Sequence, residues 1–247
     1  LCIGLSGCGK NVDTVAEITV PIEIGEHVMY GSYQGEPVEW RVLDKKDGEI
    51  LLLSEYGLDA QPFDTSGKSR VDWKDSTIRK WLNDDFYNSA FSEKEKENIV
   101  ESKSEGFEEY NTSMNLTGGG KPYAYLEREI EDKVFLLSNT ELCAYFSEDP
   151  YPGCYSDPYA HKELLCYPTA YAKQQLETRY QTETCGWWLC NHVYEDDSVE
   201  LVSAYGQGSG TSRENIKANT KSIAVRPAMW VTWQSDMEMV EANQQVE

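Results

Sequence analysis

The sequence is poor in basic residues and has no long apolar run. Its 247 residues include 22 Lys and Arg against 43 Asp and Glu, which gives a formal net charge of −21. Nucleic acid is excluded as a partner, because binding its phosphates requires a basic face. A bare anionic membrane surface is disfavoured for the same reason. A bilayer-spanning helix needs about 20 predominantly apolar residues, and no such stretch is present.

Histidine is also scarce, with three residues, and no Ser–His–Asp arrangement can be assigned from them. Cysteine occurs seven times, and Cys2 and Cys8 lie in the N-terminal segment. The other cysteines are odd in number, so at least one thiol remains unpaired within the chain. They are Cys143, Cys154, Cys166, Cys185 and Cys190. Apolar residues make up 40% of the chain, enough for the core of one large domain or two small ones.

The N-terminal residues Leu5-Ser6-Gly7-Cys8 have the pattern of a lipobox, at which bacterial lipoproteins are cleaved and lipidated. The polar stretch 9–14 follows as a tether. We expect Cys8 to become a diacylated N-terminus, since two acyl chains anchor a protein stably. Residues 1–14 are therefore predicted to serve targeting, in an extracellular protein anchored to the bacterial membrane. A phosphate-binding loop over 4–11 is the weaker alternative, because no hydroxyl residue follows its lysine.

Hydrophobic periodicity and turn signals predict one α+β domain over 15–233, followed by a polar C-terminal tail over 234–247. Strands are expected at 15–24, 38–43, 50–53, 133–137, 187–190, 199–205 and 223–233. Helices are expected at 76–87, 92–100, 140–146 and 169–176. Ser92 and Glu95 have the spacing of a capping box. Four large side chains are predicted to be buried in one core: Trp40, Trp81, Phe135 and Trp230.

Several segments of the chain, taken in order, resemble a single family. They are Glu39–Leu43, Leu51–Ser54, Trp81–Asn83, Phe86–Asn88, Lys133–Ser138, Pro168–Ala172, Cys185–Leu189 and Val225–Trp230. From about Gly31 to Trp233 the chain resembles the family of domains of unknown function numbered 6273, which occurs in exported and lipid-anchored bacterial proteins and has no established activity. Two of the family's segments are distantly similar to the formylglycine-generating-enzyme and C-type-lectin-like folds. The resemblance therefore implies a fold of that kind.

The tryptophan pair Trp187-Trp188 allows a structural and a binding interpretation. Large aromatic side chains on strands usually belong to the core. However, neighbouring strand residues face opposite sides, so one of the two is expected to be exposed in a two-layer domain. An exposed indole beside polar loops would suit a glycan, a peptide or a partner protein. The residues predicted to form this binding site are Trp188, Asn191, His192, Tyr205 and Arg213.

The cysteines near this pair permit three further hypotheses. Cys185 and Cys190 have the spacing of the copper-binding pair of formylglycine-generating enzymes, which implies a copper-dependent oxidase as an alternative function. A zinc site could be formed by Cys166, Cys185, Cys190 and His192. The spacing of these four residues matches no common zinc site, so the indication is weak. The family segments flanking Cys166 and Cys185 favour a disulfide between these two residues, and Cys143–Cys154 is a weaker pair.

The functional prediction is a non-enzymatic binding module, because no catalytic set can be assigned. A structural interaction domain of the cell envelope is a further alternative. No cofactor or metal is predicted. Calcium at the acidic run 195–197 and copper at the cysteine pair are the candidates considered, and we favour a solvated turn for the acidic run.

Overall fold

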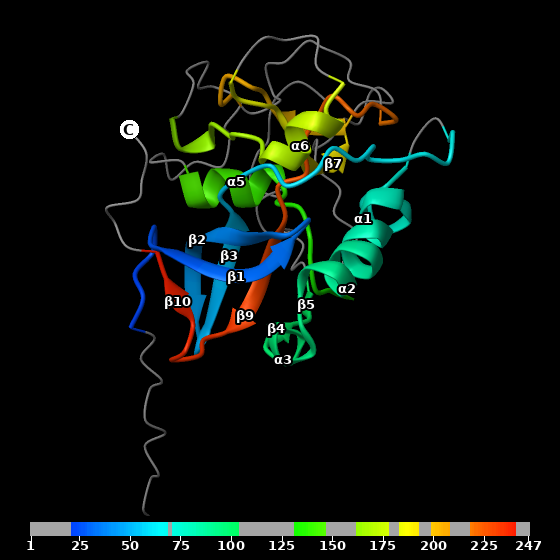
Figure 1. Cartoon of the computed structure of the whole chain (residues 1–247). Coiled ribbons are helices and arrows are strands. Elements are labelled where there is room, and N and C mark those ends of the chain that lie inside the picture. The colour runs from blue at the N-terminus through cyan, green and yellow to red at the C-terminus, as the bar shows by residue number, and fades with distance from the viewer. Residues whose placement is uncertain are drawn as a thin grey trace, which may run out of the picture.

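The computed structural model describes residues 21–68, 71–103, 131–146, 162–177, 183–192, 199–207 and 218–240. These residues form a mixed architecture, in which a large antiparallel sheet is accompanied by short helices (Figure 1). The sheet has six strands in the order β10-β1-β2-β3-β9-β4. Its strands are β1 (His27–Tyr33), β2 (Glu36–Lys46), β3 (Glu49–Ser54), β4 (Ile99–Val100), β9 (Ala228–Thr232) and β10 (Glu238–Met239).

The centre of the sheet is built from a hairpin that the sequence predicts correctly. Strands β2 and β3 pair antiparallel, with Lys46 opposite Glu49. Asp47 and Gly48 connect them with φ values of 53° and 85°. Only glycine, and to a lesser extent Asn and Asp, adopts positive φ easily, which is why this dipeptide is a strong hairpin signal. Strand β9 then pairs with β3 and brings the C-terminal part of the chain into the middle of the sheet.

A run of short helices lies beside the sheet, on the right in Figure 1. Its elements are η1 (Trp73–Asp75), α1 (Thr77–Trp81), the π-helical turn η2 (Leu82–Phe86), α2 (Tyr87–Ala90) and α3 (Glu93–Lys96). Ser76 begins α1 by accepting a hydrogen bond from the backbone N–H of Arg79. The predicted capping box of Ser92 and Glu95 is present at α3. Both caps are local side-chain contacts, so residue type and spacing suffice to predict them.

Most of the other elements lie above the sheet in Figure 1, whereas the short strand β5 (Ser102–Lys103) lies lower, next to α2. A two-stranded sheet is formed by β7 (Trp187–His192) and β8 (Val199–Val202), and a second one by β5 (Ser102–Lys103) and β6 (Glu131–Asp132). The helices in this part are α5 (Asn139–Phe146), the 3-10 turn η4 (Lys162–Leu164) and α6 (Ala170–Gln175). Within the described segments, no helix combines the length and apolar composition needed to cross a membrane.

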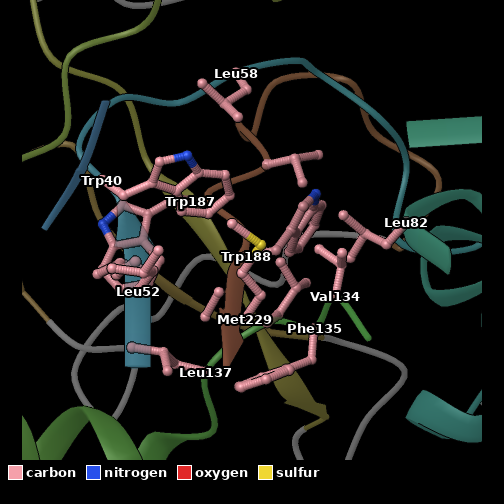
Figure 2. Close-up of a cluster of buried hydrophobic side chains, with 14 of the residues drawn as sticks. Trp40, Leu52, Leu58, Leu82, Val134, Phe135, Leu137, Trp187, Trp188 and Met229 are labelled. Atoms are coloured by element: carbon pink, nitrogen blue, oxygen red, sulfur yellow. The ribbon is translucent and has the colours of Figure 1, made fainter. Parts of the chain in front are cut away.

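One hydrophobic core joins the large sheet to the β7–β8 hairpin (Figure 2). Trp40 from β2, Met229 from β9 and both Trp187 and Trp188 from β7 are completely buried in it. The burial predicted for Trp40 and Phe135 is confirmed. This arrangement is consistent with one shared core rather than two separate ones.

Other expectations from the sequence need correction. The residues 21–24 are not part of a strand, and the first described strand is β1 instead. Phe135 makes a single antiparallel bridge to Ala228 in place of the strand expected at 133–137. Trp81 and Trp230 pack against the core but are only partly buried. Trp230 alternates with buried neighbours along β9, so its side chain points to the less covered face of the sheet.

Candidate functional site

The residues predicted to form an aromatic binding surface do not gather at the surface. Trp188 and Asn191 are buried, so the exposed indole expected for Trp188 is not found, and the role of the two residues in ligand binding stays a prediction. Tyr205 is 60% exposed. The side chain of His192 and the residue Arg213 lie outside the described part of the chain, and their predicted roles stay predictions.

Both indoles of the tryptophan pair are buried because β7 is covered on both faces. Trp187 donates its indole N–H to the carbonyl of Leu164, at 3.1 Å, and the Arg226 guanidinium lies 5.0 Å from its ring centroid. On the opposite face, Trp188 donates to the carbonyl of Gln61, at 3.0 Å, and packs edge-on against Phe63. The expectation that only one could be buried assumed two layers, whereas β7 lies between segments on both sides.

The two cysteines proposed for copper binding lie in separate surroundings. Cys185 lies beside Cys166 and Arg226, whereas the charged groups acting on Cys190 are Glu141, Glu200 and Asp132. Cys166, Cys185 and Cys190 are all buried and hold no disulfide. Among the described residues, no group of three or more His, Cys, Asp or Glu side chains could hold a metal ion.

Four other predictions depend on residues or side chains that the structure does not describe. They are the lipidation of Cys8, the Cys143–Cys154 disulfide, the zinc ligand His192 and calcium binding at 195–197. Each of these stays a prediction. The Cys166–Cys185 disulfide also stays a prediction, with its two thiols adjacent in the structure.

A polar pocket of about 590 Å³ lies between the helical run and the paired strands β5 and β6. Side chains of both charges line it, and they come from η1, α1, η2, the start of α2, β6 and the residues next to the two paired strands. The lining residues are Lys74, Asp75, Ser76, Thr77, Arg79, Lys80, Asn83, Asp84, Tyr87, Glu101, Glu131, Asp132 and Lys133. We refer to this cavity as the polar pocket.

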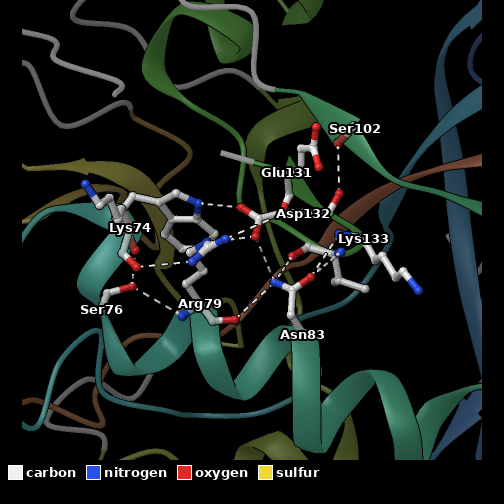
Figure 3. Close-up of polar contacts among 10 residues, drawn as sticks. Lys74, Ser76, Arg79, Asn83, Ser102, Glu131, Asp132 and Lys133 are labelled. Carbon is white, nitrogen blue, oxygen red and sulfur yellow. Dashed lines mark hydrogen bonds and ion pairs between the residues drawn. The ribbon is translucent and has the colours of Figure 1, made fainter. Parts of the chain in front are cut away.

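Asp132 organises one wall of the polar pocket (Figure 3). Its Oδ2 accepts a hydrogen bond from the indole N–H of Trp73 at 2.8 Å, and its Oδ1 accepts one from Nε of Arg79 at 2.7 Å. The Arg79 guanidinium also donates to the carbonyls of Lys74 and Glu131. These bonds join η1 and α1 to β6, so they hold the two sides of the pocket at a fixed separation.

Asn83 supports the same wall from the π-helical turn η2. Its amide N–H group donates to the carbonyl of Val134 at 2.8 Å, and its Oδ1 accepts from the backbone N–H groups of Lys133 and Val134. The side chain therefore binds the chain leaving β6 as a neighbouring strand would. Short π-helical turns occur frequently at functional sites, and this one places Asn83 at the pocket.

The buried position of Asp132 in the wall disfavours its negative charge. Burial raises the pKa of Asp132 above its ordinary value, and hydrogen bonds from Trp73 and the charge of Arg79 oppose this only in part. Arg79 is partly exposed, whereas Asp132 is almost fully buried. The carboxyl oxygens are already occupied by protein donors, so the residue is better placed to hold the wall than to act on a substrate.

The rim carries charged groups suited to a polar ligand. Lys80 and Asp84 project from α1 and η2, and Glu101 precedes β5. Across the pocket, the Lys133 ammonium group lies 4.9 Å from the centroid of the Tyr87 ring. The described lining contains no histidine or cysteine. The arrangement can bind a ligand through charge and hydrogen bonds, but it holds no recognisable nucleophile with its base.

Sequence reasoning missed this pocket, although part of its signal was present. Ser76, Arg79, Lys80, Asn83 and Tyr87 recur at three- and four-residue intervals, which places them on one face of a continuous helix. A polar face of this kind is typical of a solvent-exposed helix side, so it does not by itself indicate a binding site. The pairing of this face with Asp132 is a long-range contact that no local pattern indicates.

Comparison with known proteins gives one result. The model of the family described as "Domain of unknown function (DUF6273)" matches residues 47–233. No curated protein and no solved structure matches the chain.

Proposed function

The chain belongs to the DUF6273 family, and we propose that it is a non-enzymatic binding module that holds a charged peptide segment of a partner protein in the polar pocket. The observation that carries this proposal is the mixed charge of the pocket wall and rim. A protein of net charge −21 repels acidic partners in general, but the pocket presents Lys80 and Lys133 beside its acidic groups. A segment with both charges can satisfy both sets at once.

A peptide fits the polar pocket better than a glycan does. Sugar-binding sites commonly offer an exposed aromatic face, and the exposed tyrosines of the described chain, Tyr56, Tyr167 and Tyr205, are not among the lining residues. Tyr87 does line the pocket but is mostly buried, and the ammonium groups of Lys96 and Lys133 lie over its ring. The ligand is therefore expected to be recognised by charge and hydrogen bonds.

Charge reversal at the rim tests the peptide proposal. A phage-displayed library of random peptides and a glycan array are screened with purified protein. We expect peptides with both charges to be selected, and the double variant Lys80→Glu/Lys133→Glu to bind them on the order of tenfold more weakly, because like charges then face each other. Affinity should also fall with added salt.

The matched control is Lys173→Glu, which reverses an exposed lysine of α6 outside the pocket. It should leave the affinity unchanged. Equal weakening by both variants would show that total charge, and not the pocket, governs binding. Selection of glycans alone would contradict the peptide proposal.

Two finer features complete the proposal. The protein is exported and anchored to the outside of a bacterial membrane. The lipobox pattern at Leu5–Cys8 supports this part of the proposal. Its fold is of the C-type-lectin-like or formylglycine-generating-enzyme-like kind, as the family resemblance implies. The copper-dependent oxidase is not proposed, because the charged groups with the largest effects on the Cys185 and Cys190 thiols are different ones. A purely structural envelope domain would fail to select any peptide in the screen above.

The lipid anchor predicts that membrane retention depends on Cys8. The protein is expressed in a bacterium with a complete signal peptide ahead of Leu5, and cell fractions are probed for it. Cys8→Ala is expected to move the protein out of the membrane fraction, since the acyl chains are attached at that thiol. Ser6→Ala serves as the control and should be retained. Membrane retention of Cys8→Ala equal to that of wild type would refute the anchor.

A further inference from the structure

Two buried cysteines meet at the junction between η4 and β7. Cys166 is fully buried and Cys185 is 6% exposed. The backbone N–H of Cys185 donates to the carbonyl of Cys166 at 2.8 Å, and its thiol lies 3.5 Å from the same oxygen. The two residues are therefore neighbours in space although 19 positions separate them in the chain. The thiol of Cys166 lies 3.9 Å from the carbonyl of Tyr167.

Gly57 leaves the space in which the two sulfurs meet. A Cβ atom placed on Gly57 would lie 3.3 Å from Sγ of Cys185 and 3.5 Å from Sγ of Cys166. It would also lie only 2.8 Å from the Cβ of Ala224, which is closer than real Cβ contacts come. The absence of a side chain at this position therefore lets both cysteines and the segment before Arg226 pack against one backbone.

A buried cation lies beside this pair. Arg226 is fully buried, and its Nε donates to the carbonyl of Ser54 at 2.8 Å. Its Nη1 and Nη2 have no hydrogen-bond partner among the described residues. The nearest carboxylate oxygen, Oε2 of Glu55, is 3.8 Å from Nη2. A buried charge is costly unless it is compensated, so the guanidinium favours an anion in its surroundings.

The charge of Arg226 makes the two thiols unequal. Burial raises the pKa of Cys166. The interaction with the Cys185 thiol and the positive charge of Arg226 together lower it by more than burial raises it, so the pKa lies below its ordinary value. Glu55 opposes this effect. The pKa of Cys185 is raised by its hydrogen bond to Cys166 and by burial. Cys166 is therefore the more acidic thiol of the pair and Cys185 the less acidic one.

We propose that Cys166 and Cys185 form a reversible dithiol–disulfide site that responds to low-molecular-weight disulfides, with Arg226 as the group that stabilises the reduced form. This site is distinct from the polar pocket and does not depend on its function. Oxidation joins two segments separated along the chain and removes the acidic thiol whose ionised form Arg226 stabilises. The site therefore couples the redox state to the packing of α6 and β7 against Gly57.

The reaction is an ordinary thiol–disulfide exchange. Because Cys166 is buried, exchange takes place when the packing around it opens locally. Cys166, deprotonated, then attacks one sulfur of the small disulfide, whose S–S bond breaks and releases a thiolate. That thiolate takes the proton of Cys185. The Cys185 sulfur then attacks the Cys166 sulfur of the mixed disulfide, and a second thiolate leaves and is protonated by solvent. Two electrons pass from the cysteine pair to the small disulfide, which becomes two thiols.

Disulfide mapping tests the pairing directly. The full-length protein is equilibrated with defined ratios of reduced and oxidised glutathione, alkylated under denaturing conditions and digested with trypsin. We expect the peptides 163–173 and 180–213 to become linked as the ratio becomes oxidising. The linked form should melt on the order of 5–10 °C higher, because the bond constrains the unfolded chain.

Since the peptide 180–213 contains both Cys185 and Cys190, variants identify the partner. Cys190→Ala should keep the link and Cys185→Ala should abolish it. A link that survives in Cys185→Ala, or no link at any ratio of glutathione, would overturn the proposal.

The role of Arg226 is tested through the pH dependence of alkylation at Cys166. The alkylation rate of Cys166 rises with pH as the thiol loses its proton. In Arg226→Gln this rise should occur at higher pH, and the rate near pH 7 should be about tenfold lower for each unit by which the pKa of Cys166 increases. Arg226→Lys should keep the wild-type profile. If Arg226→Gln does not fold, Glu55→Gln decides the matter, because removing the opposing charge should shift the profile to lower pH. A profile that is unchanged in Glu55→Gln would exclude this electrostatic control.

Discussion

Trp188→Ala is expected to lower the free energy of unfolding by about 3–5 kcal/mol, the range measured when a buried tryptophan or phenylalanine is truncated. The side chain is completely buried, packs against Phe63 with ring centroids 6.0 Å apart, and donates a hydrogen bond to Gln61. Truncation removes these contacts and leaves the Gln61 carbonyl without this donor. Urea unfolding followed by circular dichroism measures the change.

The exposed Tyr205 provides the matched control for this experiment. Tyr205→Ala removes an aromatic side chain that is 60% exposed, so its free energy of unfolding should stay within about 0.5 kcal/mol of wild type. Comparing the two variants also distinguishes a structural role of Trp188 in the core from a role in ligand binding at the surface. If Trp188→Ala unfolds at the wild-type urea concentration, the indole cannot lie in the core as described.

Asp132→Ala is expected to cost about 3 kcal/mol, because it leaves Trp73 and Arg79 without their shared acceptor. Asp132→Asn should cost only about 1 kcal/mol, since the amide oxygen can still accept one of these hydrogen bonds. Urea unfolding near neutral pH measures both changes. Equal losses for the two variants would indicate that packing, and not hydrogen bonding, is what the side chain contributes.

The same pair of variants predicts a difference in pH dependence. The pKa of Asp132 in the folded protein is raised above its ordinary value of 3.8. The folded state then binds the proton more tightly than the unfolded state. The contribution of this group to stability is therefore greatest at low pH and falls as the pH rises through the raised pKa. Asp132→Asn cannot titrate, so the stability difference between wild type and this variant should change in that direction as the pH rises above the ordinary pKa of 3.8.

Residues that share a helix could be grouped from the sequence, whereas contacts between distant segments could not. The face formed by Ser76, Arg79 and Asn83 could have been recognised from its helical spacing. The role of Asp132 could not, because it contacts Arg79 across 53 positions of the chain. The indole of Trp188 was expected at a surface because the residues that cover it, such as Gln61 and Phe63, are also distant in the chain. Alternation along β7 indicates which side chains share a face, but not what covers each face.

Features that depend on neighbouring residues were determined by the sequence alone. The hairpin turn at Asp47-Gly48, the capping box of Ser92 and Glu95 and the family membership follow from residue type and spacing. Only the tertiary structure decided that β7 is buried on both faces, that the polar pocket forms, and that Cys166 lies beside Cys185 and Arg226. These features arise where distant segments meet, and the free energy of such contacts depends on the packing of the whole domain rather than on any local pattern.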